Sequence, residues 1–242
     1  MPELLITRRG RVAILTLNRP AQGNRLTAPL VREIAAALEL LRSDGAIGAC
    51  VLTGQGDVFC LGGDYAGAGP TELERTEYAN ALIAMDDAMA KLGKPLIAAV
   101  NGDAHAGGFC TVVACDLAVA AEDATLGLPE AANGLFPFIA LAIVKDELPK
   151  QVLFDLIYNA RLISAAEAQS LHVMNEAVPR AAVLDRAVEL AEQASRHDPE
   201  IVALGRDLYY RTRGLDPGGA LAEARRALLA ALKVKDRGGR RG

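Results

Sequence analysis

Gly107 and Gly108 form a glycine pair at the start of an expected helix, where backbone groups could do chemistry. An apolar run at residues 96–100 predicts a strand before the pair, and the apolar residues 109–115 predict a helix after it. The first N–H groups of a helix have no partner within the helix and lie at the positive end of its dipole. They can therefore hold an anion or a developing oxyanion. A tight strand-to-helix turn that binds nothing is the alternative interpretation.

A second glycine-rich loop, at residues 54–64, follows another expected buried strand at residues 48–53. Each of the two loops could supply one backbone N–H to the same small oxygen atom. Neither the spacing of Gly54 and Gly56 nor the pair Gly62 and Gly63 matches a dinucleotide-binding or P-loop motif. The two loops therefore indicate oxyanion binding rather than nucleotide binding.

The elements that would position these loops are short strands and helices in alternation. Residues 4–7 and 11–17 predict a hairpin, and residues 28–42, capped by Thr27, predict an amphipathic helix. A further helix is expected between residues 70 and 93, and strands are expected at 115–120 and 125–128. This order predicts an α/β fold of repeated ββα units rather than a Rossmann alternation. Later helices are expected at residues 148–158, 164–171, 181–195, 200–211 and 221–233.

Composition excludes several classes of function. The chain has 242 residues, of which 51% are hydrophobic, and a net charge of −4, so it can bury a large core and has no basic face for nucleic acid. No apolar run approaches the ~18 residues of a membrane span, and the amino terminus lacks a signal-peptide pattern. We therefore expect a cytoplasmic protein without a membrane partner. The charged tail at residues 235–242 is expected to be disordered.

The cysteines and histidines do not indicate a metal site. The four cysteines lie in or beside apolar segments without C-x-x-C spacing, so free and mostly buried thiols are expected. The three histidines, His105, His172 and His197, share neither a helical face nor a ligand spacing. We therefore expect no metal.

Four blocks in a fixed order make the sequence resemble the crotonase superfamily of enoyl-CoA hydratases and isomerases. The blocks are residues 18–26, 59–64 (Phe-Cys-Leu-Gly-Gly-Asp) and 94–108, followed by Leu128-Pro129-Glu130 with Gly134-Leu135. Segments 161–168 and 175–179 also resemble the part that follows the core in this family. Together the matches span most of residues 11–180.

The resemblance implies a crotonase-like spiral of ββα units in residues 1–185, which holds the active site. Residues 186–242 would form a helical oligomerisation region with the disordered tail, in a homotrimer or a dimer of trimers. The substrate would be an acyl-CoA thioester, with no tightly bound cofactor. The thioester carbonyl would lie between the N–H groups of Leu61, where the family usually has alanine, and Gly107. The coenzyme A part of the substrate would contact Arg25, Leu26, Asp64, Tyr65 and Gly108.

The expected proton-transfer residue is Glu130, and here the chain departs from hydratases. Hydratases typically place two glutamates on the substrate, whereas this chain has Cys110 at the first position and Glu130 at the second. A lone carboxylate in an apolar site has a raised pKa and can move a proton between two carbons, which suits an isomerase better than water addition. A helix-start carboxylate is the structural alternative for Glu130. Cys110 is expected to be a packed side chain rather than a nucleophile.

Other functions stay open at this point. A crotonase-fold thioesterase or decarboxylase would keep the oxyanion hole and change the remaining chemistry. A relative that binds acyl-CoA without turnover would explain the missing glutamate but not the retained Glu130. A serine hydrolase is disfavoured because the chain contains no G-x-S-x-G motif.

Overall fold

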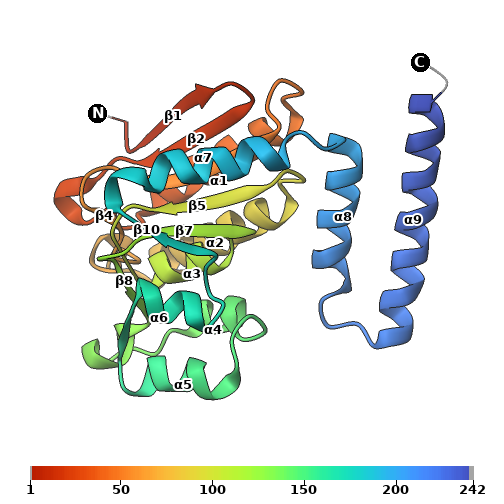
Figure 1. Cartoon of the computed structure of the whole chain (residues 1–242). Helices are drawn as coiled ribbons and strands as arrows, with labels where there is room; N and C mark the ends of the chain where they lie inside the picture. The colour runs from red at the N-terminus through yellow and green to blue at the C-terminus, as the bar shows by residue number, and fades with distance from the viewer. Residues whose placement is uncertain (1, 240–242) are drawn as a thin grey trace.

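The computed structural model describes residues 2–239, which fold into short strands and helices in alternation (Figure 1). The strands are β1 (Leu4–Arg9), β2 (Val12–Leu17), β3 (Ala49–Gly54), β4 (Val58–Cys60), β5 (Leu96–Val100), β6 (Asp103–His105), β7 (Leu117–Ala121), β8 (Thr125–Gly127), β9 (Leu162–Ser164) and β10 (Glu176–Val178). The helices are α1 (Ala28–Ser43), α2 (Glu72–Lys91), α3 (Gly107–Val113), α4 (Phe138–Val144), α5 (Lys150–Tyr158), α6 (Ala165–Ser170), α7 (Val183–Ala194), α8 (Pro199–Thr212) and α9 (Pro217–Gly239).

The strands belong to two sheets, and three of the ββα units contribute one strand to each of them. The six-stranded sheet has the order β1-β2-β3-β5-β7-β10, and the four-stranded sheet has the order β4-β6-β8-β9. In the units β3-β4-α2, β5-β6-α3 and β7-β8-α4, the first strand joins the large sheet and the second joins the small one. The predicted repetition of ββα units is therefore confirmed, as is the antiparallel hairpin of β1 and β2.

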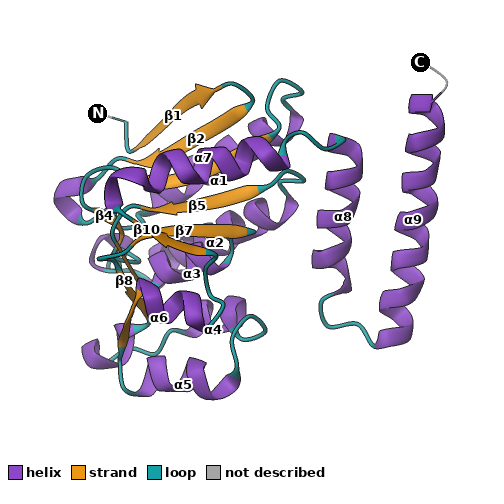
Figure 2. Cartoon of the chain, viewed as in Figure 1, coloured by secondary structure: helices purple, strands orange, loops and turns teal. Residues whose placement is uncertain are grey.

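The large sheet is covered on both faces, which explains its nearly continuous apolar strands. Successive side chains of a strand point to opposite faces. In β2, Leu15 and Leu17 pack in the cluster that contains α1 and α2, whereas Val12 and Ile14 pack in the cluster that contains α7. Figure 2 shows α7 lying across the strands. The glycine pairs at residues 62–63 and 107–108 follow β4 and β6, which belong to the small sheet.

Helix α7 belongs to the core, because Val188 and other apolar residues of this helix are buried against the sheet. The expected boundary between residues 185 and 186 therefore falls inside a core helix. The helices that stand beside the core are α8 and α9 (Figure 1). The buried side chain of Arg206 fixes α8, because its Nε lies 2.9 Å from Asp116 Oδ2 and its Nη1 donates to the carbonyl of Ala90 at 2.6 Å.

The expectation of a disordered tail is wrong for residues 235–239, since α9 continues to Gly239. Arg237 forms an ion pair with Glu200 on α8 at 2.7 Å, so the charged end of α9 has a partner in the neighbouring helix. Residues 240–242 lie outside the described residues. No helix in the described part of the chain is long and apolar enough to cross a membrane. The cytoplasmic location stays a prediction.

The sequence predicted β8 of the small sheet, at residues 125–128, but not β4, β6, β9, β10 or α4. All four strands of the small sheet have only three residues each, and β4 and β6 lie just before the glycine pairs at residues 62–63 and 107–108. The four cysteines are free, as expected, and Cys50, Cys60 and Cys110 are buried.

Candidate active site

Three cavities adjoin one another and share lining residues. The outer cavity, about 470 Å³, is lined by Arg25, Asp64 and neighbouring residues. The inner cavity, about 40 Å³, is lined by Leu26, Met85, Cys110 and others, and it shares Gly63, Tyr65 and Glu130 with the outer cavity. The distal cavity, about 370 Å³, shares Asp86, Ala114 and Ile143 with the inner one. Glu130 and Asp86 thus lie at the two junctions.

The backbone N–H groups of Gly63 and Gly107 approach each other at the inner cavity. A Cβ atom on Gly107 would lie 3.5 Å from the nitrogen of Gly63. Within residues 2–239 neither N–H donates to another group, and Gly107 opens α3, where a helix leaves its first N–H groups free. Ala106, just before it, has a φ of 54°, a strained value for a residue with a side chain. The chain is thus held in an unusual turn that exposes two donors to one small space.

The structure corrects the predicted role of Leu61. Its N–H donates to the carbonyl of Gly23 at 2.9 Å and is therefore not available to a ligand. Its carbonyl accepts a hydrogen bond from Arg25 Nη1 at 2.9 Å, and its side chain lines the outer cavity. The residue whose free N–H faces Gly107 is Gly63, two positions further along the loop.

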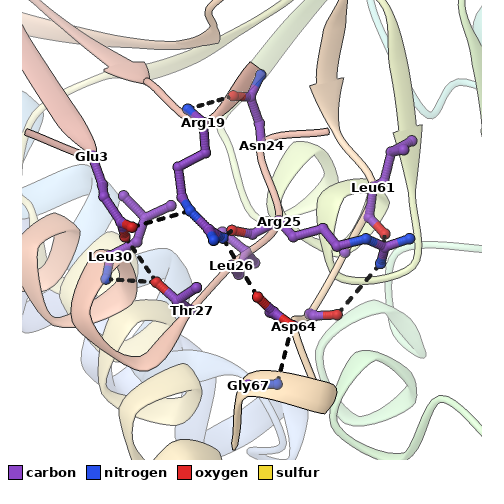
Figure 3. A network of polar contacts seen from close by, with 12 residues as sticks. Glu3, Arg19, Asn24, Arg25, Leu26, Thr27, Leu30, Leu61, Asp64 and Gly67 are labelled. Carbon is purple, nitrogen blue, oxygen red and sulfur yellow. Dashed lines mark hydrogen bonds and ion pairs between the residues drawn. The ribbon is translucent and has the colours of Figure 1, made fainter. Parts of the chain in front are cut away.

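Arg25 and Asp64 hold the backbone around the outer cavity (Figure 3). Arg25 donates to the carbonyl of Leu61, and Asp64 Oδ1 accepts from the N–H of Gly67 at 3.2 Å. Arg19 lies 3.6 Å from Asp64 and 3.1 Å from Glu3. Both residues expected to contact coenzyme A thus line the outer cavity and also fix the loop that carries Gly63.

Of the other three residues expected to contact coenzyme A, two line a cavity and one is packed in the core. Leu26 lines the inner cavity, and its carbonyl accepts from the hydroxyl of Tyr78 at 2.7 Å. Tyr65 lines both the inner and the outer cavity and packs edge-on against Tyr78. Gly108 is buried, because a Cβ atom there would lie 2.0 Å from the carbonyl oxygen of Cys60. Gly108 thus permits the close packing that positions Gly107.

Glu130 is a buried carboxylate with unused hydrogen-bonding capacity. It belongs to a short 3₁₀ turn, Pro129–Asn133, and is 7% exposed. Its Oε2 has no hydrogen-bond partner within the described residues. Burial raises the pKa of Glu130 above its ordinary value because the charged form loses hydration, and the residue's own backbone N–H opposes this only in part. A buried carboxylate without a partner, aimed at a cavity, is suited to accept a proton from a ligand.

Cys110 and Asp86 lie deeper in the inner cavity. Burial raises the pKa of the Cys110 thiol, and the nearby carboxylates of Asp86 and Glu130 raise it further, so this side chain stays a neutral thiol. Sequence reasoning missed Asp86 as a site residue. The available signal was a carboxylate at helical spacing with Leu82, Met85 and Met89, in an otherwise apolar stripe.

The remaining expectations concern His105 and metals. His105 lines the outer cavity, with Nε2 2.8 Å from Thr125 Oγ1. That hydroxyl donates to Asp103 at 2.8 Å, so the imidazole is anchored within the protein. Among residues 2–239, no group of three or more His, Cys, Asp and Glu side chains is arranged to hold a metal ion.

Comparison with known proteins identifies the family to which this fold belongs. The family model described as enoyl-CoA hydratase/isomerase matches residues 7–237. The chain is 36% identical over 206 residues to the enoyl-CoA hydratase EchA19 of Mycobacterium tuberculosis, covering 82% of this chain and 76% of the relative. It is 30% identical to the 2,3-dehydroadipyl-CoA hydratase of Escherichia coli, covering 98% of this chain and 93% of that one.

Solved structures give the same result. The crystal structure of enoyl-CoA hydratase from Mycobacterium smegmatis superposes with a TM-score of 0.91 at 29% identity, covering 96% of this chain and 91% of the other. The fold is therefore the crotonase fold with a helical carboxy-terminal region. By family match, sequence identity and fold, this chain is an enzyme of the enoyl-CoA hydratase/isomerase family.

Proposed function

We propose that the protein moves a proton on the acyl group of a CoA thioester, with Glu130 as the proton carrier and the N–H groups of Gly63 and Gly107 as the oxyanion hole. The observation that carries the proposal is the buried Oε2 of Glu130, which lacks a partner at the junction that also contains Gly63. Donors fixed in advance stabilise an enolate oxygen as charge develops, and one donor contributes roughly 3 kcal/mol.

The proposed reaction converts a 3-enoyl thioester into a 2-enoyl thioester. Ionised Glu130 removes a proton from the α carbon, and the electron pair moves to the thioester oxygen, which Gly63 and Gly107 hold. The same carboxylic acid then returns the proton to the γ carbon while the double bond shifts. One carboxylate suffices because the proton leaves one carbon and returns to another on the same molecule.

Cys110 supports isomerisation over hydration as the main activity. Addition of water needs a group that orients or deprotonates the water, and the neutral thiol of Cys110 is a weak acceptor. Hydration is the second candidate, because the relatives at 36% and 30% identity are named hydratases.

The outer cavity is the proposed site of the coenzyme A part of the substrate. Arg25, Tyr65 and His105 line it and offer a cation, an aromatic ring and an imidazole to a charged and partly aromatic group. Coenzyme A would be part of the substrate, and no tightly bound cofactor is proposed.

A homotrimer or a dimer of trimers is proposed as the assembly. Leucines on α9 remain exposed in the single chain, including Leu221 at 71% and Leu228 at 59%. Such an apolar face on a helix beside the core supports contact between subunits. Light scattering of the purified protein would give the mass of the assembly, and a monomeric mass would contradict this part of the proposal.

Product analysis tests the proposed function. The protein is incubated separately with short 3-enoyl-CoA and 2-enoyl-CoA esters, and the products are separated by chromatography. We expect 2-enoyl-CoA from the first substrate at a higher rate than 3-hydroxyacyl-CoA from the second. Release of free coenzyme A alone would indicate a thioesterase, loss of CO₂ from a malonyl-type ester would indicate a decarboxylase, and binding without any product would indicate a non-catalytic relative.

A further inference from the structure

Three segments of the chain meet at the junction between the inner and distal cavities. Asp86 comes from α2, Ala114 from the end of α3, and Ile143 from α4, and each lines both cavities. Along α2, Met85 lines only the inner cavity and Ala90 only the distal one. Met89 also lines only the inner cavity, so Met85 and Met89 lie on the side of α2 that borders the inner cavity, and Asp86 and Ala90 lie on the side that borders the distal one. Asp86 thus lies at the passage between the two cavities.

The passage lies at a distance that an acyl chain can reach. The proposed oxyanion donor Gly107 begins α3, and Ala114 follows its last residue. At 1.5 Å per residue this path along the helix is about 10 Å. The acyl chain of a medium-length thioester held at Gly107 would therefore end near Asp86.

The distal cavity is polar, and most of its charged groups already have partners. Arg213 lies 2.9 Å from Glu147, and the hydroxyl of Tyr209 donates to the same carboxylate at 3.1 Å. Asp116 is paired with Arg206. These contacts neutralise two of the three carboxylates that line the distal cavity.

Asp86 is the third carboxylate, and it has no hydrogen bond or ion pair within residues 2–239. It is partly buried, and Arg213, which is near enough to act on its charge, is within ion-pair distance of Glu147 instead. Partial burial raises the pKa of Asp86, because its charged form loses part of its hydration. A ligand group that donates a hydrogen bond to Asp86 would replace the hydration that this carboxylate has lost.

We propose that the distal cavity receives the far end of the acyl chain and that Asp86 selects acyl groups that end in a hydrogen-bond donor, a hydroxyl or an amine. The inference rests on the proposed function, since it takes the thioester to lie at Gly107. A methyl end would leave Asp86 without a partner, and a carboxylate end would face a like charge. Asp86 is thus a specificity-determining residue that acts far from the reacting carbons.

Binding of saturated esters, which have no double bond to react, tests the inference apart from catalysis. The affinities of octanoyl-, decanoyl- and dodecanoyl-CoA are measured by titration calorimetry beside those of their ω-hydroxy, ω-amino and ω-carboxy counterparts. For the chain length that reaches the passage, we expect the wild type to bind the hydroxy or amino ester about tenfold more tightly than the plain ester, and the carboxy ester more weakly.

Three variants complete the experiment. Asp86→Leu is expected to bind the plain ester at least as tightly as the hydroxy and amino esters. Asp86→Asn is expected to keep the preference for hydroxyl and lose that for ammonium. Asp87→Asn is the matched control, because Asp87 is exposed, pairs with Lys91 at 2.7 Å and lines neither cavity. It is expected to keep the wild-type preference.

Two outcomes would overturn the inference. One is a wild type that binds every plain ester as tightly as its hydroxy and amino counterparts, and the other is a preference that persists in Asp86→Leu. In both cases the plain esters still bind, so the proposed function stands. If no CoA ester of any kind binds, the proposed function fails, and the inference fails with it.

Discussion

The nitrogen of Gly63 lies 3.5 Å from the position that a Cβ atom on Gly107 would occupy, although the two glycines belong to different ββα units. The space between them is therefore about the size of one atom. Both N–H groups are free within residues 2–239 and border the cavity that contains Glu130. In our proposal this space holds the thioester oxygen.

Alanine at Gly107 should separate activity from stability. In Gly107→Ala the added methyl group makes only ordinary contacts at 3.5 Å, and alanine favours a helix by about 1 kcal/mol, so we expect little change in the thermal midpoint. The methyl group takes the space of the oxygen, so kcat/KM should fall by ~10²-fold or more. Steady-state kinetics and thermal unfolding check the two expectations.

Gly108→Ala is the comparison, because its methyl group would lie 2.0 Å from the carbonyl oxygen of Cys60. This variant should lose several degrees in thermal midpoint as well as activity. A Gly107→Ala enzyme with wild-type kcat/KM would exclude the space beside Gly63 as the oxyanion site.

The buried carboxylate of Glu130 should lower stability at neutral pH. The pKa of Glu130 is raised in the folded protein, so the folded state favours the protonated form of this residue. The stability that the protonated form contributes is full below the unfolded pKa and is lost as pH rises through the folded pKa. Glu130→Gln removes the charge and should raise the thermal midpoint at pH 7, by roughly 2–4 °C for each kcal/mol. The difference should shrink toward zero at pH values below the ordinary glutamate pKa. A difference that is the same at all pH values would show that the charge is not its cause.

Cys110→Glu should increase hydration relative to isomerisation. The new carboxylate would enter the inner cavity, where it could hold the attacking water beside Glu130. Because burial and two neighbouring carboxylates already raise the pKa of Cys110, we also expect a lower thermal midpoint. Cys110→Gln is the matched control of similar size without a base. If a well-folded Cys110→Glu protein hydrates no faster than Cys110→Gln, the missing glutamate is not what limits hydration.

Asn24 should be essential for the stability of the first loop. It is 0% exposed and has a φ of 52°, and its side chain accepts from the N–H of Arg19 and donates to the carbonyls of Gln55 and Val58. Asn24→Ala should lower the free energy of unfolding by roughly 3 kcal/mol, because three hydrogen bonds of a buried side chain are lost. Asn18→Ala, at a partly exposed position, should change it by less than about 1 kcal/mol. Denaturant unfolding measures both, and equal losses would contradict this role.

The repetition of strands and helices was predictable because local patterns determine it. Strand β5 has the predicted limits, and α1 begins at the predicted cap, where the N–H of Leu30 donates to Thr27 at 3.2 Å. Of the small sheet only β8 was predicted, because three-residue strands such as β4 and β6 carry no periodic signal. Their pairing depends on the stacking of successive ββα units.

The site was predictable as far as single motifs define it. Glu130 and Gly107 lie on the same cavity, as the motifs implied. The prediction of Leu61 as an oxyanion donor was wrong, because its N–H donates to the carbonyl of Gly23. This contact between two loops is visible only in the folded backbone. Asp86 was missed because its importance comes from the junction of two cavities rather than from its neighbours in sequence.

Deuterium exchange at the α carbon of a CoA ester tests the central claim most directly, since it follows the proton that Glu130 is proposed to move. In deuterated water, the wild type should exchange the α hydrogens of a saturated acyl-CoA, and Glu130→Gln should exchange them ~10²- to 10⁴-fold more slowly while binding the ester with similar affinity. Glu122→Gln, at an exposed position after β7, should behave like the wild type. Equal exchange rates in the wild type and Glu130→Gln would contradict the assignment of Glu130 as the proton carrier.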